Sequence, residues 1–152
     1  MNIHGSKILT PPPDTALILG IPVHRLSADE TVEAVLNLVE CGRRDGKPRL
    51  VTTINVDFLV KTLSWRGALP RHPELMRVLR SSDLRTADGM PLVWASRLLG
   101  APLPERVTGA DLVPALAERA AETGASMYLL GGDKAIAAET AARLQKQNPD
   151  LK

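Results

Sequence analysis

The segment from Leu50 to Ile54 restricts the fold of this chain more than any other stretch. It is β-branched and apolar on both faces, a pattern typical of a strand buried inside a parallel sheet. Asn55 ends the strand and is the expected N-cap of a helix over residues 56–63. A buried parallel strand that leads directly into a helix indicates an α/β protein.

Strand and helix signals alternate along the rest of the chain. We expect strands over residues 16–21, 83–87 and 127–130, and helices over 27–42, 73–80, 91–100, 108–124 and 133–147. Ser27 and Glu30 have the spacing of a capping box, and Gly42 is the expected end of the first helix. The alternation predicts a Rossmann-like α/β fold with an open, largely parallel sheet flanked by helices.

Length and composition indicate a soluble globular protein of one domain. The chain has 152 residues, of which 44% are hydrophobic and 24% charged, enough for a substantial core. Residues 1–14 include Pro11-Pro12-Pro13 and are expected to form a flexible leader, so the single α/β domain spans residues 15–152. One Phe, one Tyr and two Trp are too few for the stacking platforms that bind single-stranded nucleic acid, so we expect no nucleic-acid partner.

The net charge is +2, and the basic residues form two local groups without a long basic block. The groups are Arg43, Arg44, Lys47 and Arg49, and Arg66, Arg71, Arg77 and Arg80. Each is either a solvated rim, the commoner case, or a patch for anionic lipid or phosphate. No window approaches the roughly 20 apolar residues of a membrane-spanning helix, so any membrane contact is expected to be peripheral. Cys41 is alone, which excludes a disulfide framework and fits a reducing cytoplasm.

Asp88 is the sharpest candidate for a catalytic residue. It follows the strand expected over residues 83–87 and precedes Gly89, whose lack of a side chain lets a ligand approach the backbone. Ligands of open α/β sheets bind outside the carboxyl ends of the strands, where a carboxylate can take a proton from a hydroxyl nucleophile. The alternative is structural, because an Asp-Gly pair also makes an ordinary turn and helix cap.

Two further segments are candidate anion sites. Gly131 and Gly132 lie between an expected strand and an expected helix, where free N–H groups can hold a phosphate. Arg106 with Thr108 and Gly109 precedes another expected helix, although a surface arginine and an ordinary cap explain the same residues. The chain lacks both the dinucleotide and the P-loop glycine patterns, so no cofactor is expected. Its histidines are scattered and it has no Asp-x-Asp motif, so no metal site is expected either.

Five motifs occur in order along most of the chain. They are Ile18-Leu19-Gly20-Ile21-Pro22-Val23, Thr53-Ile54-Asn55, Ala87-Asp88-Gly89, Gly100 with Glu105-Arg106-Val107-Thr108-Gly109-Ala110-Asp111-Leu112, and Tyr128-Leu129-Leu130-Gly131-Gly132. Together they resemble the WecG/TagA/CpsF family of bacterial glycosyltransferases. The resemblance implies inverting, metal-independent transfer of a sugar, commonly N-acetylmannosamine, from a UDP-sugar donor to a polyprenyl-diphosphate-linked acceptor. It places this reaction at the cytoplasmic face of the plasma membrane, with Thr53 and Asn55 near the substrates and Asp88 as the catalytic residue.

The chain departs from the family pattern at two places. Residues 64–71 are extra and are expected to form a surface loop, and the chain stops at Lys152, where family members continue into further motifs and a basic, membrane-contacting tail. We therefore expect a truncated copy or a fragment, whose bare edge would be covered by self-association into a homo-oligomer. The alternative function is a non-catalytic α/β module that binds a nucleotide sugar or a partner protein.

Overall fold

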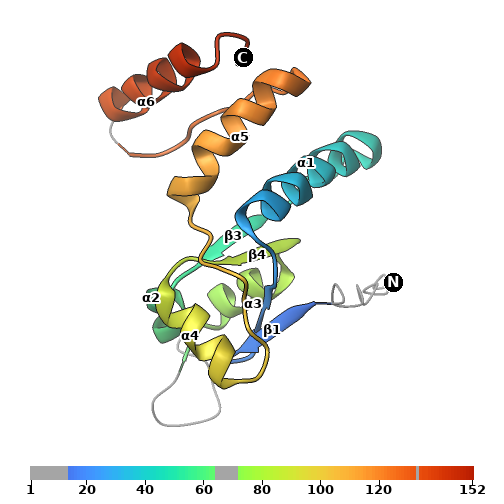
Figure 1. Cartoon of the computed structure of the whole chain (residues 1–152), viewed down its shortest axis with the longest axis vertical. Coiled ribbons are helices and arrows are strands. Elements are labelled where there is room, and N and C mark those ends of the chain that lie inside the picture. The colour runs from blue at the N-terminus through green and yellow to red at the C-terminus, as the bar shows by residue number, and fades with distance from the viewer. Residues whose placement is uncertain (1–13, 64–71, 133) are drawn as a thin grey trace, which may run out of the picture. The chain divides into compact units, whose positions relative to one another are not determined.

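The computed structural model of the protein describes residues 14–63, 72–132 and 134–152, which form four strands and six helices (Figure 1). The class is α/β, as the sequence predicts. The chain divides into two compact units, residues 1–108 and 109–152. The leader and the extra loop expected over residues 1–14 and 64–71 lie outside the described residues, apart from Asp14. That residues 15–152 form one domain stays a prediction.

The first unit begins with an antiparallel hairpin, where we predicted one strand over residues 16–21. Strands β1 (Thr15–Ile18) and β2 (Ile21–His24) pair so that Ile18 lies opposite Ile21. Leu19 and Gly20 both have positive φ values, 49° and 80°, the conformation of a two-residue turn whose twist matches that of a hairpin. The prediction was wrong because the apolar character of Leu19 hides a turn that sequence patterns associate with Asn-Gly or Gly-Gly.

The second strand pair is parallel, as the sequence predicts for Leu50 to Ile54. β3 (Val51–Ile54) pairs with β4 (Leu84–Ala87), and Figure 1 shows the two strands side by side. Thr53 lies opposite Thr86, and Ile54 lies opposite Ala87. The described residues thus contain one parallel and one antiparallel pair, so the sheet structure is smaller and more mixed than a largely parallel open sheet.

Local capping signals correctly predicted the starts of two of the helices. The first unit holds α1 (Ala28–Asp45), α2 (Val56–Thr62), α3 (Pro73–Ser81) and α4 (Met90–Leu98), and the second holds α5 (Gly109–Thr123) and α6 (Lys134–Gln147). The capping box of Ser27 and Glu30 is present at the start of α1. Asn55 caps α2, because its Oδ1 accepts a hydrogen bond from the backbone N–H of Phe58 at 3.0 Å. No helix among the described residues is both long and apolar enough to span a membrane.

The end of α1 corrects the prediction that Gly42 stops this helix. The helix continues to Asp45, and Gly46 ends it with a left-handed φ of 68°. Gly42 has a different reason to be glycine: a Cβ at this position would lie 2.9 Å from the backbone oxygen of Lys47. A larger residue would force apart the helix and the segment that leads back toward β3. Cys41, beside it, is exposed.

The core of the first unit is formed by both strand pairs together with helices and the segment after α4. Its buried members come from both pairs, from α2, α3 and α4, and from the segment after α4; they are Ala16, Ile18, Ile21, Val23, Ile54, Leu59, Leu79, Ala87, Leu92 and Leu103. Burial of this apolar surface is the main term that stabilises the unit.

A buried polar contact connects the hairpin to β4. The backbone N–H of Arg85 donates to Nδ1 of His24 at 3.0 Å. The guanidinium of Arg85 donates to the carbonyl oxygens of Pro22, Arg80 and Ser82. Burial lowers the pKa of His24, and the neighbouring charge of Arg85 lowers it further. Burial also lowers the pKa of Arg85, whose N–H groups are compensated by carbonyl oxygens in place of water.

The second unit packs α5 against α6 around Ala117, Ala120, Leu144 and Leu151. We predicted a strand over Met127–Leu130, and the structure assigns none to the described residues there. The burial still alternates: Met127 and Leu129 pack on the core, whereas Tyr128 and Leu130 are exposed. The N–H of Met127 donates to the backbone oxygen of Lys152 at 3.0 Å. The side-chain pattern is thus that of a strand, but a strand requires a neighbouring strand to pair with.

Candidate active site

Asp88 and Asn55 lie at the carboxyl ends of the two parallel strands. The N–H of Asp88 donates to the backbone oxygen of Ile54 at 2.7 Å, so the ladder between β3 and β4 continues one residue beyond the last paired positions. Because side chains two residues apart share a face of a strand, Thr53 and Asn55 are expected on the same face as Thr86 and Asp88. The register therefore brings together three of the residues that the sequence singled out.

The carboxylate of Asp88 is half-buried and is not the cap of the helix that follows. Gly89 occupies the N-cap position of α4, which has no side-chain capping bond. Within the part of the chain that the structure describes, the side chain of Asp88 has no hydrogen bond or ion pair. The Asp-Gly pair does make the turn from β4 into α4, but the capping role considered for Asp88 is absent. Its carboxylate remains available to a substrate.

Position 89 needs glycine because of its backbone conformation, and not because a side chain would lack room there. Its φ and ψ are both 140°, a region that side-chain-bearing residues rarely occupy. A Cβ at this position would meet Pro91 Cδ at 3.6 Å, an ordinary contact. Glycine thus lets the chain turn sharply after Asp88, and it leaves the carboxyl end of β4 open.

The segment from Glu105 to Thr108 runs beside β4 at this same end. The N–H of Val107 donates to the backbone oxygen of Ala87 at 2.9 Å, and Oγ1 of Thr86 donates to that of Val107 at 3.1 Å. Thr108 is buried and Arg106 is exposed. Thr86, which we did not predict as a site residue, is a buried threonine whose hydroxyl fixes this segment.

Asn55 and Glu105 each use one side-chain oxygen in a structural hydrogen bond. The cap of α2 uses Oδ1 of Asn55, so the amide N–H groups are the donors that a ligand would meet. Oε1 of Glu105 accepts from the N–H of Ala28 at 2.7 Å, at the start of α1. Glu105 and Ala28 are 77 residues apart, so no local pattern could have revealed this contact.

The remaining predicted residues belong to the second unit. Gly109 is the first residue of α5. Gly131 and Gly132 precede α6, are exposed and have positive φ values of 113° and 70°. Asp133, the expected cap of α6, lies outside the described residues. The φ values account for both glycines, and their phosphate-binding role stays a prediction.

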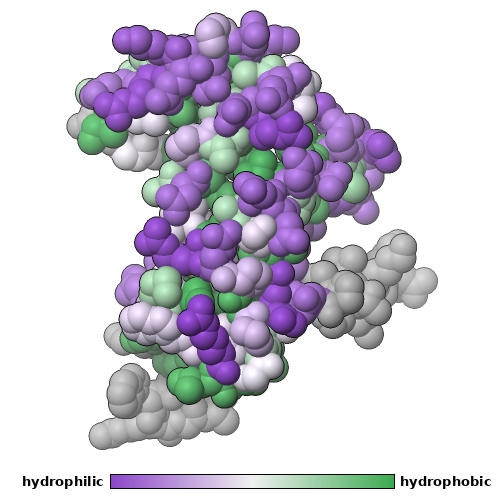
Figure 2. Space-filling view, in the orientation of Figure 1, coloured by the Kyte–Doolittle hydropathy of each residue, from purple (hydrophilic) through white to green (hydrophobic). Residues whose placement is uncertain are grey.

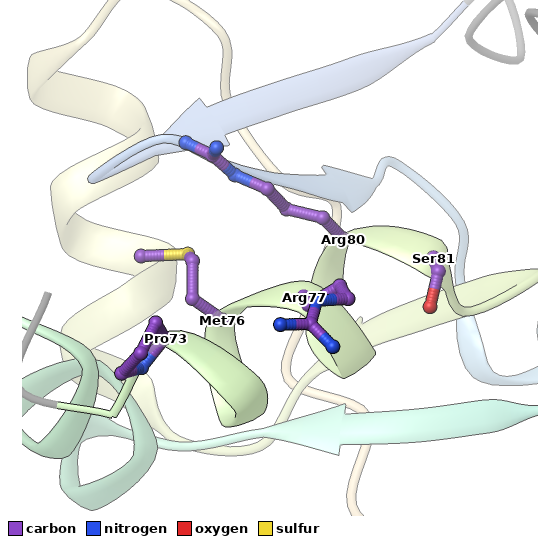
Figure 3. Close-up of a pocket in the computed structure, with 5 residues that line it drawn as sticks. All are labelled: Pro73, Met76, Arg77, Arg80 and Ser81. Carbon is purple, nitrogen blue, oxygen red and sulfur yellow. The ribbon is translucent and has the colours of Figure 1, made fainter.

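The concave surface shown in Figure 3 is separate from the candidate active site around Asp88. This pocket on α3 has a volume of about 500 Å³, and its lining contains none of the residues predicted for the site. Arg80 extends from α3 to the hairpin turn, where its Nε donates to the backbone oxygen of Gly20 at 2.9 Å (Figure 3). Arg80 therefore supports the turn. Among the described residues, no group of three or more His, Cys, Asp or Glu side chains is arranged to hold a metal ion.

Comparison with known proteins agrees with the motifs. The chain is 32% identical over 81 residues to the N-acetylglucosaminyldiphosphoundecaprenol N-acetyl-beta-D-mannosaminyltransferase of Bacillus spizizenii; the match covers 53% of this chain and 32% of that protein. The chain thus spans about a third of the length of this relative. The model of the glycosyl transferase WecG/TagA/CpsF family matches residues 16–152. Since this match takes in both units and nearly the whole sequence, the chain belongs to the WecG/TagA/CpsF family of glycosyl transferases.

Proposed function

We propose that the gene product carrying these residues is an inverting glycosyltransferase of bacterial cell-surface polysaccharide or teichoic acid synthesis. It moves N-acetylmannosamine or a related hexose from a UDP-sugar to a polyprenyl-diphosphate-linked acceptor at the inner face of the plasma membrane. Family membership supports the reaction class. The name of the Bacillus spizizenii relative supports the type of sugar and the acceptor.

The position of the Asp88 carboxylate is the observation that supports this proposal most. Its carboxylate is half-buried at a strand end, beside Asn55, and it is not used to cap α4. In the proposed step, Asp88 takes the proton of the acceptor hydroxyl while the hydroxyl oxygen attacks the anomeric carbon. The bond from this carbon to the UDP oxygen breaks on the opposite face, and the configuration inverts. Thr53 and Asn55 position the substrates.

The UDP leaving group carries negative charge that must be stabilised. We assign this role to Arg106 and to the backbone N–H groups around Thr108 and Gly109, where α5 begins. Gly89 leaves room for the substrate next to Asp88. Gly131 and Gly132 are the candidates for phosphate contacts in the second unit.

The test of this proposal is the substitution Asp88→Asn in the gene product. The amide keeps the size of the side chain and cannot accept the proton, so the transfer rate should fall by about 10²–10⁴. Binding of the UDP-sugar, measured by calorimetry, should hardly change. Asp57→Asn is the matched control, because Asp57 lies on α2 in an exposed pair with Lys61, and it should leave the rate unaltered.

Two results would contradict the proposal. A loss of thermal stability with a normal rate per folded molecule would give Asp88 a structural role only. Binding of a UDP-sugar by the unmodified protein without any transfer to polyprenyl-diphosphate acceptors would favour the non-catalytic binding module.

A further inference from the structure

The outward face of α4 is apolar, which is unusual for a helix on a protein surface. Met90, Trp94 and Leu98 are spaced four residues apart and therefore lie along one side of the helix. They are exposed to 39%, 56% and 90%. The opposite side of α4 contributes the buried residues Leu92, Val93 and Ser96 to the interior of the first unit. A helix that is apolar on both sides requires a second covering surface.

Arg97 adds one positive charge to this side of the helix. Residues 89–104 contain no Asp or Glu, and Arg97 is their only charged residue. Leu99, directly after the helix, is also exposed. We call Met90, Trp94, Arg97 and Leu98 the α4 face. Where Figure 1 draws α4, Figure 2 shows hydrophobic side chains mixed with intermediate and strongly hydrophilic ones.

We propose that the α4 face docks on the surface of a lipid bilayer that contains anionic lipids. Tryptophan prefers the interface between headgroups and acyl chains, and a surface helix can lie in this plane with its exposed apolar side toward the acyl chains. The guanidinium of Arg97 is complementary to anionic headgroups, which attract basic residues near the surface. A second copy of the chain fits less well, because a symmetric contact through this face would bring the two Arg97 side chains into one patch.

Docking would also fix the height of the candidate active site relative to the bilayer surface. α4 begins two residues after Asp88 and has nine residues, a length of about 13 Å. With its exposed side in the interface, the helix would hold Asp88 near the level of the headgroups. An acceptor diphosphate anchored by a polyprenyl chain lies at this level. This consequence rests on the proposed function, whereas the docking itself does not.

The test measures binding of the 152-residue chain to sedimented vesicles. Vesicles of phosphatidylcholine with phosphatidylglycerol are compared with vesicles of phosphatidylcholine alone. Leu98→Asp should weaken binding to the mixed vesicles about tenfold. Leu130→Asp is the matched control, since Leu130 is also a leucine exposed to 90% but lies in the second unit; it should bind as the parent does. Arg97→Glu should lower binding to the mixed vesicles at least fivefold and should hardly change binding to phosphatidylcholine.

Trp94 provides a second readout that does not depend on these substitutions. The chain has one other tryptophan, Trp65, which is replaced by Phe in every variant. The emission of Trp94 should then shift to shorter wavelength on the mixed vesicles. An unchanged emission, or equal binding by Leu98→Asp and Leu130→Asp, would overturn the proposal. Sedimentation velocity measures the oligomeric state of the same variants. If Leu98→Asp changes the oligomeric state and leaves vesicle binding unchanged, the α4 face is a contact between copies and the proposal is overturned. No sugar transfer is measured, so failure of the proposed reaction would not affect this result.

Discussion

At the scale of single residues, the contact between His24 and Arg85 shows how one polar pair can be kept in an apolar core. The N–H of Arg85 supplies a donor to the imidazole, and three carbonyl oxygens receive the guanidinium. An unpaired polar group at the same depth would cost about 1–3 kcal/mol. The pair links β2 to β4, and β4 leads directly to Asp88.

The lowered pKa of His24 predicts a pH dependence of stability. The unfolded chain has an ordinary imidazole pKa of about 6.5, whereas the folded pKa lies below this value. Above about pH 6.5 the imidazole is neutral in both states, so its stabilising contact is fully present. As the pH falls from about 6.5 through the folded pKa, the unfolded state binds a proton first, and the free energy of unfolding declines.

Urea denaturation at about pH 7.5, 6.5 and 5.5 measures this decline. His24→Asn should reduce it, because the amide oxygen of Asn can accept from the N–H of Arg85 and does not titrate. If the variant and the parent decline equally over this range, the buried imidazole is not the cause.

At the scale of elements, the start of α1 is stabilised from two directions. Ser27 Oγ accepts from the N–H of Glu30 at 3.2 Å, and Glu105 accepts from the N–H of Ala28 at 2.7 Å. The second contact also places a negative charge at the positive end of the helix dipole. α1 and the segment beside β4 are therefore connected through Glu105.

Glu105→Ala should lower the free energy of unfolding by about 1 kcal/mol, because it removes one acceptor and the charge at the helix start. Glu105→Gln keeps an acceptor oxygen and should cost less. Glu118→Ala, at an exposed position on α5, is the control and should have little effect. Chemical denaturation of the three variants gives the comparison. Equal losses for Glu105→Ala and Glu118→Ala would show that the contact contributes nothing.

The elements also show what the sequence could predict and why. The capping box of α1 and the cap at Asn55 were predicted correctly because each involves residues three apart, whose spacing is visible in the sequence. The hairpin and the unpaired segment over Met127–Leu130 were predicted wrongly. Strand pairing depends on distant partners and on turn geometry, and neither is written in the local pattern.

The candidate site also contains residues that the sequence could predict and contacts that it could not. Thr53, Asn55 and Asp88 were recognised as strand-end residues, and the register of β3 with β4 agrees with their grouping. Thr86 and the structural contact of Glu105 could not be found, because each depends on a partner 21 or 77 residues away. Chemical roles at the site stay predictions.

At the scale of the whole molecule, two cores lie in two units. We predict that they respond separately to substitution. Leu151→Ala removes a buried side chain from the second core and should destabilise it by about 2–5 kcal/mol. Native-state hydrogen exchange should then show lower protection over residues 109–152 only. Ile54→Ala, in the first core, should lower protection over the described residues up to 108.

The two cores could instead unfold together. Loss of protection throughout the chain in both variants would show that the two units unfold as one. It would support the prediction that residues 15–152 form a single domain.

Cys41 has a consequence for how the protein is handled in the laboratory. It is the only cysteine of the chain and is exposed on α1, so air oxidation can join two molecules through one disulfide. A covalent dimer of this kind would elute from a sizing column like a true oligomer. Samples kept under reductant, or carrying Cys41→Ser, would remove this artefact. The same thiol also offers a single attachment point for a spectroscopic label, without any engineered cysteine.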